Sequence, residues 1–268
     1  MIHELSVVHP DAKIGKDVTI GPFTTVAADV VIGDGCWIAP HVSIMDGVRM
    51  GNNCKIFQGA IVGSTPQDLK YNGEKTNLTI GDKTIVREYA TLNIGTIATW
   101  NTVIGRNCLI MAYAHVAHDC IIGNNVVLAN NVTLAGHIEI GDYARLGGMV
   151  AVHQFVKIGK HSFIGGGSLV PKDVPPFVLA ARNPIAYAGI NRVGLQRSPD
   201  FTQEQIERIT DIYRILFVRG GGNFVKAVPI IKDEIPDTPE RQEILAFIES
   251  SKRGLIKGFR ALKGGSER

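Results

Sequence analysis

The chain has 268 residues, 45% of them hydrophobic, and its 28 basic and 25 acidic side chains give a weak net charge of +3. Its 30 glycines suit a β-solenoid better than a helical bundle, and no zinc spacing or aromatic–basic interleaving indicates a nucleic-acid-binding module. No run of 18 apolar residues and no signal peptide is present. We therefore expect a cytoplasmic protein without a transmembrane segment.

An aliphatic residue recurs at every sixth position from Ile14 to Val170. Of the 27 positions in this series, 24 carry Ile, Leu, Val or Met, and only Asp68, Glu74 and Ala98 do not. A hexapeptide period is typical of a parallel β-helix, in which each hexad forms a short strand and a corner. Three hexads close a triangular coil of roughly 18 residues, and stacked strands rise by about 4.8 Å per coil.

The other hexad positions agree with this interpretation. The second is often Gly, where a corner needs little side-chain bulk, and the fifth is almost always small, so two residues per hexad face inward. Asn pairs at 52–53, 124–125 and 130–131 suit corners that visit positive φ. All four cysteines fall on the fifth position and are interpreted as core filler. Two of them are 18 residues apart and can stack, so a disulfide between them stays open: Cys36 and Cys54.

Two segments interrupt the period without changing its phase. Between Val62 and Ile80 the chain is polar and rich in turn residues, which predicts an ejected loop at about residues 64–78. A shorter interruption around Gly95 to Asn101 predicts a second loop. Loops on a rigid scaffold often carry function.

The hexad pattern ends near residues 174–176, which predicts a β-helix domain over residues 1–188 and a helical domain over residues 189–268. Residues 202–205 form a capping box that Phe201 and Ile206 flank as a hydrophobic staple. This predicts a helix over about 203–219 that ends at the glycines 220–222. Asn223 and Thr238-Pro239 are expected caps of two further helices, which can cover the open end of the solenoid and contact other subunits.

The C-terminal region is the more basic part of the chain. Residues 182–268 hold 15 Lys and Arg against 11 Asp and Glu, and residues 252–268 hold six against one. Two interpretations stay open: a solvated helical face, or a docking surface for an acidic partner protein.

Histidines carry the chemistry. His118, His137 and His153 fall in hexads whose starts are 18 residues apart, so they are expected on successive coils of one wall. His118 and His153 are then roughly 10 Å apart along the axis, the span of a small-molecule site. His115 is expected to come from the preceding corner and to point into the same cleft.

His118 and Asp119 place an imidazole beside a carboxylate, which fixes a tautomer and stabilises an imidazolium. Such a base near neutral pH is what an alcohol needs when it attacks an acyl carbonyl. The backbone N–H of Gly136 can serve as an oxyanion donor. No Cys or Ser is placed as a covalent nucleophile, so direct acyl transfer is the economical mechanism, and we expect no cofactor and no metal.

Six short strings resemble the UDP-N-acetylglucosamine O-acyltransferase family, which begins lipid A synthesis. They are PQDLKY at 66–71, AHVAHDC at 114–120, LANN at 128–131, LAGH at 134–137, GGM at 147–149 and AVHQF at 151–155. The resemblance covers essentially the whole chain. It implies a left-handed parallel β-helix, a homotrimer and active sites between neighbouring subunits. The hand comes from the resemblance alone, because left-handed crossovers are rare in sheets.

The resemblance also implies roles for single residues. His118 matches a general base that takes the proton of the sugar 3-hydroxyl as it attacks the thioester of a 3-hydroxyacyl chain on acyl carrier protein. Asp119 matches its supporting carboxylate, and the Gly136 amide matches the oxyanion donor. Gly166 matches a position that measures the end of the acyl chain, where a Gly leaves room for a longer one. The matched contacts are His115, His137, His153 and Gln154 for the sugar and acyl site, Asp68 and Lys70 for the glucosamine nucleotide, and Asn191 and Arg197 for its phosphates.

One departure concerns the segment after Gly194-Leu195. The family commonly has consecutive basic residues there, whereas this chain has Arg197 alone between Gln196 and Ser198. Phosphate or carrier-protein contacts at those two flanking positions are therefore in question. Arg182 and Arg192 are candidate substitutes on charge alone.

Other functions are weighed against this one. The acceptor can carry a 3-amine instead of a 3-hydroxyl. The later N-acyltransferase of the same pathway has a sizeable domain ahead of its β-helix, whereas the period here starts by Ile14. A zinc-dependent β-helical carbonic anhydrase has a His pair four residues apart, which His153 lacks. A structural or ice-binding solenoid would show a regular exposed Thr array, and none is present.

Overall fold

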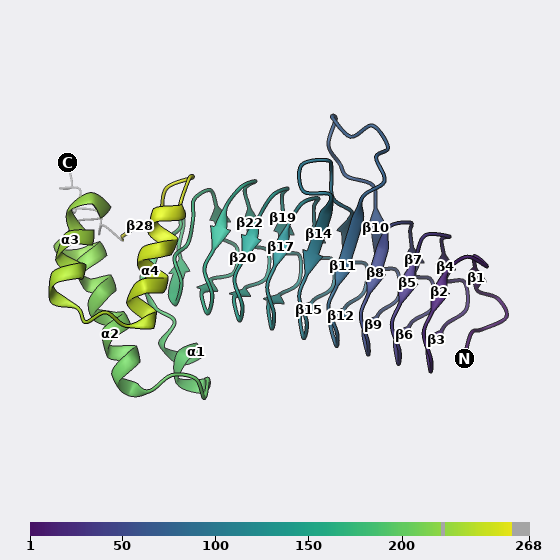
Figure 1. The fold of residues 1–268 in the computed structure, drawn as a ribbon, viewed down its shortest axis with the longest axis horizontal. Coiled ribbons are helices and arrows are strands. Elements are labelled where there is room, and N and C mark those ends of the chain that lie inside the picture. The colour runs from purple at the N-terminus through teal and green to yellow at the C-terminus, as the bar shows by residue number, and fades with distance from the viewer. Residues whose placement is uncertain (221–222, 259–268) are drawn as a thin grey trace, which may run out of the picture.

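The computed structural model describes residues 1–220 and 223–258. A long three-sided prism of short strands carries a cluster of helices at its C-terminal end (Figure 1). Strands of successive coils pair in parallel and form three sheets of nine, eight and eleven strands. The predicted hexapeptide β-helix with a C-terminal helical region is confirmed.

Each coil visits the three sheets in a fixed order, and we name them the first, second and third wall. The first wall contains β1 (Val7–Val8), β4 (Thr25–Val26), β7 (Ser43–Ile44), β10 (Ile61–Ser64), β13 (Thr91–Asn93), β16 (His115–Val116), β19 (Thr133–Leu134), β22 (Ala151–Val152) and β25 (Leu169–Val170). The second wall contains β2 (Lys13–Ile14), β5 (Val31–Ile32), β8 (Val48–Met50), β11 (Asn77–Ile80), β14 (Asn101–Ile104), β17 (Ile121–Ile122), β20 (Glu139–Ile140) and β23 (Lys157–Ile158). The third wall contains β3 (Thr19–Ile20), β6 (Trp37–Ile38), β9 (Lys55–Ile56), β12 (Ile85–Val86), β15 (Leu109–Ile110), β18 (Val127–Leu128), β21 (Arg145–Leu146), β24 (Phe163–Ile164), β26 (Val178–Ala181), β27 (Ala186–Ile190) and β28 (Lys257–Gly258).

The aliphatic period becomes the core of the prism. Every residue of the series from Ile20 to Val170 is buried, apart from the three interruptions. Regular partners lie one coil apart, as in the pair Val116 and Leu134, so identical hexad positions stack. Burial of one apolar side chain per strand in a continuous stack stabilises the solenoid, since no single coil can bury its own inner face.

Glycine at the second hexad position has a specific cause at the corner between the second and third walls. At this corner the side chain at the third hexad position accepts the backbone N–H of the third-position residue one coil earlier. The Asp34 carboxylate accepts the Lys16 N–H at 2.7 Å, and the Asn52 side-chain oxygen accepts the Asp34 N–H at 2.8 Å. The accepting oxygen lies over the second position, so a Cβ on Gly33 would come within 2.6 Å of the Asn52 side-chain oxygen. Only glycine leaves room for this ladder.

The fourth hexad position bends the chain. Asn53, Asn125 and Asn131 have φ of 56°, 58° and 60°, which confirms the prediction for the Asn pairs. The same left-handed conformation occurs at many bulky residues, among them the site residues Asp119 (60°) and His137 (62°). The solenoid imposes this conformation at these corners.

The four cysteines do more than fill the core. Each thiol donates to a corner carbonyl of the next coil, Cys36 to Gly51 at 3.1 Å and Cys120 to Ala135 at 3.2 Å, just as the Thr24 hydroxyl donates to the Ala39 carbonyl at 2.7 Å. A small side chain with a donor therefore satisfies a buried backbone acceptor. All four thiols are free and buried.

Both interruptions of the period are insertions at the corner between the first and second walls, which we call the first corner. Val62 pairs with Leu92 and Ile80 with Ile104, at separations of 30 and 24 residues instead of the regular 18. The first insertion follows β10 and the second follows β13, and both project from the same edge of the prism (Figure 1). Insertions of whole hexads keep the phase, which is why the period resumes undisturbed.

The C-terminal region contains α1 (Arg192–Arg197), α2 (Gln203–Arg214), which continues as the π-helical segment η1 (Ile215–Arg219), α3 (Phe224–Glu234) and α4 (Pro239–Ser250). The predicted capping box of α2 is confirmed, with Thr202 accepting from the Gln205 N–H. Asn223 caps α3 as expected, whereas the Thr238 side chain makes no capping bond to α4. The segment ends at Gly220. Residues 221–222 and 259–268 lie outside the described residues, and with them the part of the predicted basic tail that follows residue 258.

The helical region closes the C-terminal end of the prism. Buried Tyr213 of α2 donates its hydroxyl to the Pro176 carbonyl, and Ser251 donates to Asp173 at 2.6 Å. Helix α1 and the antiparallel pair β26 and β27 have no counterpart among the predicted elements. The division into domains at residue 188 stays a prediction. No helix among the described residues is long and apolar enough to span a membrane.

Candidate active site

The predicted histidines form a column along the first corner. The corners that follow β16, β19 and β22 carry His118, His137 and His153, and these three strands are neighbours in the first wall. The prediction of successive coils on one wall is confirmed. The two insertions occupy the two preceding positions of the same corner, so the ejected loops lie next to the column.

His118 and Asp119 form a close pair at the centre of this column. The His118 Nδ1 lies 2.8 Å from the Asp119 Oδ2, and the Asp119 side chain is fully buried. Burial alone would raise the pKa of Asp119, but hydrogen bonds from Thr99, His118 and Thr96 lower it to about 2. An ionised carboxylate only accepts, so Nδ1 carries the proton and the Nε2 lone pair is the basic one.

Gly136 lies directly against the His118 ring. A Cβ added there would come within 2.6 Å of the His118 Cε1 and 2.8 Å of its Nε2. Among the described residues no acceptor takes the Gly136 N–H, whereas its carbonyl accepts from Phe155. A free backbone donor therefore lies beside the basic edge of the imidazole, the arrangement that an oxyanion requires.

His115 and His137 complete the column. His115 lies within strand β16, so its predicted place in the preceding corner was wrong, because the strand starts one residue before the buried Val116. Its Nδ1 is 2.8 Å from the Thr91 hydroxyl. His137 stands edge-on to His118 with ring centroids 5.1 Å apart and stacks on Phe155 at 4.5 Å. Burial, and then the charge of His118, lowers the pKa of His115, and burial lowers that of His137.

The remaining predicted residues of this group lie nearer the surface. The Asp68 carboxylate accepts the Lys70 N–H at 3.0 Å on the ejected loop, and its charge acts to raise the pKa of His137, so this part of the loop lies near the column. His153 and Gln154 are exposed at the end of the column. All of them border one stretch of the first corner.

Three side chains of the column also meet the geometry of a metal site. His118, Asp119 and His137 each offer a ligand atom, and these atoms lie within 4.8 Å of one another. The Asp119 oxygens already accept bonds from Thr96, Thr99 and His118. A cation would have to displace these donors to bind the carboxylate. The expectation of a metal-free site stays a prediction.

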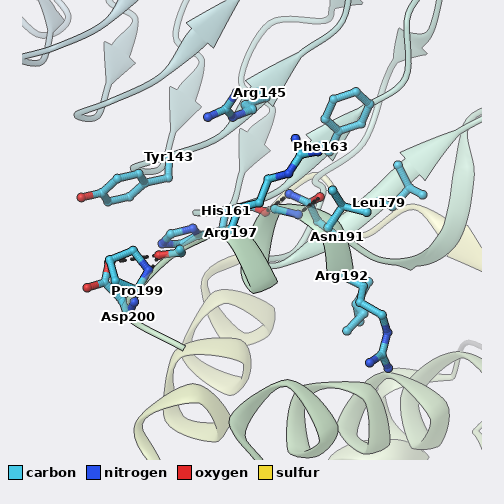
Figure 2. A pocket seen from close by; sticks show the side chains of 14 residues that line it. Tyr143, Arg145, His161, Phe163, Leu179, Asn191, Arg192, Arg197, Pro199 and Asp200 are labelled. Atoms are coloured by element: carbon cyan, nitrogen blue, oxygen red, sulfur yellow. Dashed lines mark hydrogen bonds between the residues drawn. The ribbon is translucent and has the colours of Figure 1, made fainter. Parts of the chain in front are cut away.

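A separate cavity of about 870 Å³ lies where the third wall meets the helical region. In Figure 2 Arg197 of α1 lies among the side chains of Arg145, His161 and Phe163. Asn191 fixes the start of α1, since its amide donates to the His161 carbonyl at 2.9 Å and accepts from the Gly194 N–H at 3.2 Å. Arg192 and Ser198 also line the cavity, and Gln196 does not.

The predicted site residues therefore form two groups. Nine of the twelve border the first corner, whereas Asn191 and Arg197 line the cavity at the third wall. Gly166 follows β24 at the corner between the third and first walls. One chain does not bring the two groups together, because different walls of the prism present them.

Sequence reasoning missed residues in both places. Thr96 and Thr99 of the second insertion bond the Asp119 carboxylate, and Thr102 of β14 accepts the Asp119 N–H; their spacing of three was the available signal. The aromatic and basic lining of the cavity was also missed. It includes Tyr143 and Arg145, which occupy unremarkable hexad positions.

The cavity edge contains an unusual histidine, which gives a pH prediction. His161 stacks between Tyr143 and Phe177 at 4.6 and 6.1 Å, and burial, followed by the charge of Lys160, lowers its pKa from 6.5 to about 4. The folded state binds this proton more weakly than the unfolded chain, so this contribution to stability is full above pH 6.5 and is lost as the pH falls toward 4. We expect His161→Phe to flatten the fall of the thermal midpoint over this range. Equal slopes for both proteins would contradict the assignment.

Comparisons with known proteins agree over nearly the whole chain. A family model described as UDP N-acetylglucosamine O-acyltransferase, domain 2, matches residues 173–256, a bacterial transferase hexapeptide model matches 101–136, and a model of the GMPPB C-terminal domain matches 2–104. Acyl-[acyl-carrier-protein]--UDP-N-acetylglucosamine O-acyltransferases of Myxococcus xanthus and Thiobacillus denitrificans are 45% and 43% identical, each over 96% of this chain and 99% of the relative. The chain belongs to the UDP-N-acetylglucosamine O-acyltransferase family.

Solved structures of this family have the same architecture. The crystal structure of LpxA from Bacteroides fragilis matches with a TM-score of 0.93 at 44% identity, over 96% of this chain and all of that one. The enzyme of Francisella novicida matches with a TM-score of 0.92 at 41% identity, over 96% and 94%. Membership of this acyltransferase family sets aside the carbonic anhydrase, the later N-acyltransferase and the purely structural solenoid.

Proposed function

We propose that this enzyme transfers a 3-hydroxyacyl chain from acyl carrier protein to the 3-hydroxyl of UDP-N-acetylglucosamine, the first step of lipid A synthesis. Its curated relatives are named for the acyl-carrier-protein donor and this sugar nucleotide. The observation that carries the mechanism is the 2.8 Å pair of His118 and buried Asp119 against the free N–H of Gly136. A base and an oxyanion donor that lie side by side suit direct acyl transfer.

The reaction follows from these positions. His118 Nε2 takes the proton of the sugar hydroxyl as its oxygen attacks the thioester carbonyl carbon. The carbonyl oxygen becomes an oxyanion and accepts the Gly136 N–H, while Asp119 stabilises the imidazolium. Collapse of this intermediate breaks the carbon–sulfur bond, and the imidazolium returns its proton to the leaving thiolate. The ester and the free carrier thiol are the products, and no cofactor is needed.

We also propose that the active enzyme is a homotrimer with sites between subunits. The outward residues of the first wall include no Lys, Arg, Asp or Glu, unlike those of the second wall, which include Arg49 and Lys157. Val7 and Leu169 of the first wall are 68% and 67% exposed. A flat uncharged wall of this kind suits burial against another copy. Such packing would also let the first corner of one chain meet the cavity of its neighbour.

Mixed subunits test this sharing. His118→Ala and Arg197→Ala change the two separate groups, so each variant alone is expected to lose most transfer activity. Co-expression should restore part of it, because a mixed trimer contains sites with both residues intact. The measurement is turnover of co-expressed, doubly tagged protein against each variant. Hybrids as inactive as the single variants would contradict a shared site.

One assay tests the reaction itself. A panel of 3-hydroxyacyl carrier proteins is offered with UDP-N-acetylglucosamine and, in parallel, with its 3-amino analogue. We expect ester product, and we expect the longer chains to react well because Gly166 has no side chain to shorten the acyl site. A preference for the 3-amino analogue would identify the amine as the acceptor group instead of the hydroxyl. If no donor gives any product, the proposed function is overturned. A cytoplasmic location stays a prediction.

A further inference from the structure

We propose that Thr96 and Thr99, both from the second insertion, are positioning residues that hold the Asp119 carboxylate and, through it, the His118 ring. This inference rests on the proposed function, in which His118 is the base. It adds a role for the insertion, which otherwise only interrupts the hexad period.

The contacts come from one short segment. Thr96 donates its N–H to Asp119 Oδ1 at 3.0 Å and its hydroxyl to Oδ2 at 2.7 Å. The Thr99 hydroxyl donates to Oδ1 at 2.5 Å. On the backbone side, the Thr102 hydroxyl accepts the Asp119 N–H at 2.8 Å. Two hydroxyls and one backbone N–H of this segment thus hold the carboxylate, while Thr102 holds the Asp119 backbone.

The donor directions are consistent. The Thr96 oxygen accepts the Ala98 N–H at 3.2 Å, which leaves its proton for the carboxylate. Thr99 also lies 2.9 Å from the Asn101 carbonyl, but a charged acceptor at a shorter distance is the stronger partner. With His118 as the fourth donor, the buried carboxylate has its lone pairs occupied in one orientation.

The insertion explains how these hydroxyls reach the site. A regular first corner passes from the first wall to the second within one hexad, and it bonds to the neighbouring coil through its backbone, as the His137 N–H does to the His118 carbonyl. The extra hexad after β13 folds back through a turn, in which the Trp100 N–H donates to the Thr96 carbonyl at 2.7 Å. Gly95 makes this possible, since a Cβ there would lie 2.5 Å from the Asn101 nitrogen. The turn then covers Asp119 on the following coil.

Removal of the hydroxyls gives a defined kinetic result. Thr96→Val and Thr99→Val keep the side-chain shape, but each removes one hydroxyl that donates to the Asp119 carboxylate. The carboxylate can then rotate, and the His118 ring bonded to it is no longer held in one orientation. We expect each to lower kcat by about 10- to 100-fold with KM values of both substrates unchanged, because a misplacement of about 1 Å costs a rate factor of that order. Thr96→Ser and Thr99→Ser keep a hydroxyl and should retain most activity.

Two controls separate positioning from folding. Thr84→Val also removes a buried hydroxyl that bonds backbone, to the Gly105 carbonyl at 2.7 Å, but it does not touch Asp119 and should keep kcat. In an Asp119→Ala background the Val substitutions should cost nothing more, because their only route to His118 is gone. Full extra losses there, or Val variants with wild-type kcat, would overturn the inference.

A spectroscopic measurement makes this test independent of the proposed function. In protein with ¹⁵N-labelled histidine, the His118 Nδ1–H signal is identified by its loss in His118→Ala. We expect Thr96→Val/Thr99→Val to shift or broaden that signal, whereas Thr84→Val leaves it in place. An unchanged signal would overturn the positioning role. If the wild-type protein transfers no acyl chain but the Thr96→Val/Thr99→Val variant still shifts the His118 signal, the proposed function is overturned and the positioning role stands.

Discussion

Replacement of His118 with Ala is expected to lower acyl-transfer turnover by about 10²- to 10⁴-fold near neutral pH, the usual worth of a positioned general base. The sugar hydroxyl is a weak nucleophile until its proton is removed, and Nε2 of His118 is the free basic atom at the centre of the column. Among the described residues His137 is the nearest alternative, but its Nε2 lies 3.8 Å from the Asp119 carboxylate rather than in a close pair. The measurement is kcat with saturating acyl carrier protein and sugar nucleotide.

The variant should remain folded. The His118 side chain is partly exposed at a corner, and the core consists of the aliphatic series, which this change leaves alone. His9→Ala is a matched control, because His9 also lies beside a carboxylate, 3.7 Å from Asp11, but near the N-terminal end of the prism. We expect wild-type turnover and thermal midpoint for it. Near-normal turnover of His118→Ala would contradict the base assignment.

The fold was predictable because its repeat is local. Each hexad repeats an inward aliphatic residue, so a count in sixes locates the strands from β2 to β25 and predicts that His118 and His137 lie on successive coils. The corner glycines could be predicted as positions but not explained, since the Asn52 oxygen that occupies the space over Gly33 comes from the next coil. Periodicity gives the stack, and the stack determines which side chains are neighbours.

The parts that were missed depend on contacts outside the period. Thr96 and Thr99 reach Asp119 only because the second insertion folds back across the corner, and an insertion has no register from which to predict such a contact. The cavity likewise depends on α1, a helix of six residues that Asn191 holds against the His161 carbonyl. Short helices of this kind have little helical propensity of their own and form through tertiary contacts.

The separation of the two groups of site residues is informative about assembly. A resemblance could assign Arg197 and His118 to one site, but only the walls show that a single prism presents them on different sides. If both groups serve one site, as we propose, the second group must come from another copy of the chain.

Gly136→Ala is expected to lower kcat by about 100-fold or more although it changes no polar group. Ala keeps the backbone N–H, so the oxyanion donor survives, but its Cβ would lie 2.6 Å from the His118 Cε1. The His118 ring must move by several tenths of an ångström at least, away from its bond to Asp119. A displacement of the base of this size lowers the rate of proton transfer and therefore kcat. The measurement is kcat alongside the His118 Nδ1–H signal.

Gly148 offers a matched control, because it occupies the same hexad position on another wall. A Cβ there meets only the Asn130 carbonyl oxygen at 3.4 Å, so Gly148→Ala should keep wild-type turnover. In a His118→Ala background Gly136→Ala should add no loss, since there is no ring left to displace. Wild-type kcat for Gly136→Ala would show that transfer tolerates a shifted imidazole, and a further loss without His118 would mean that Gly136 acts on the oxyanion instead.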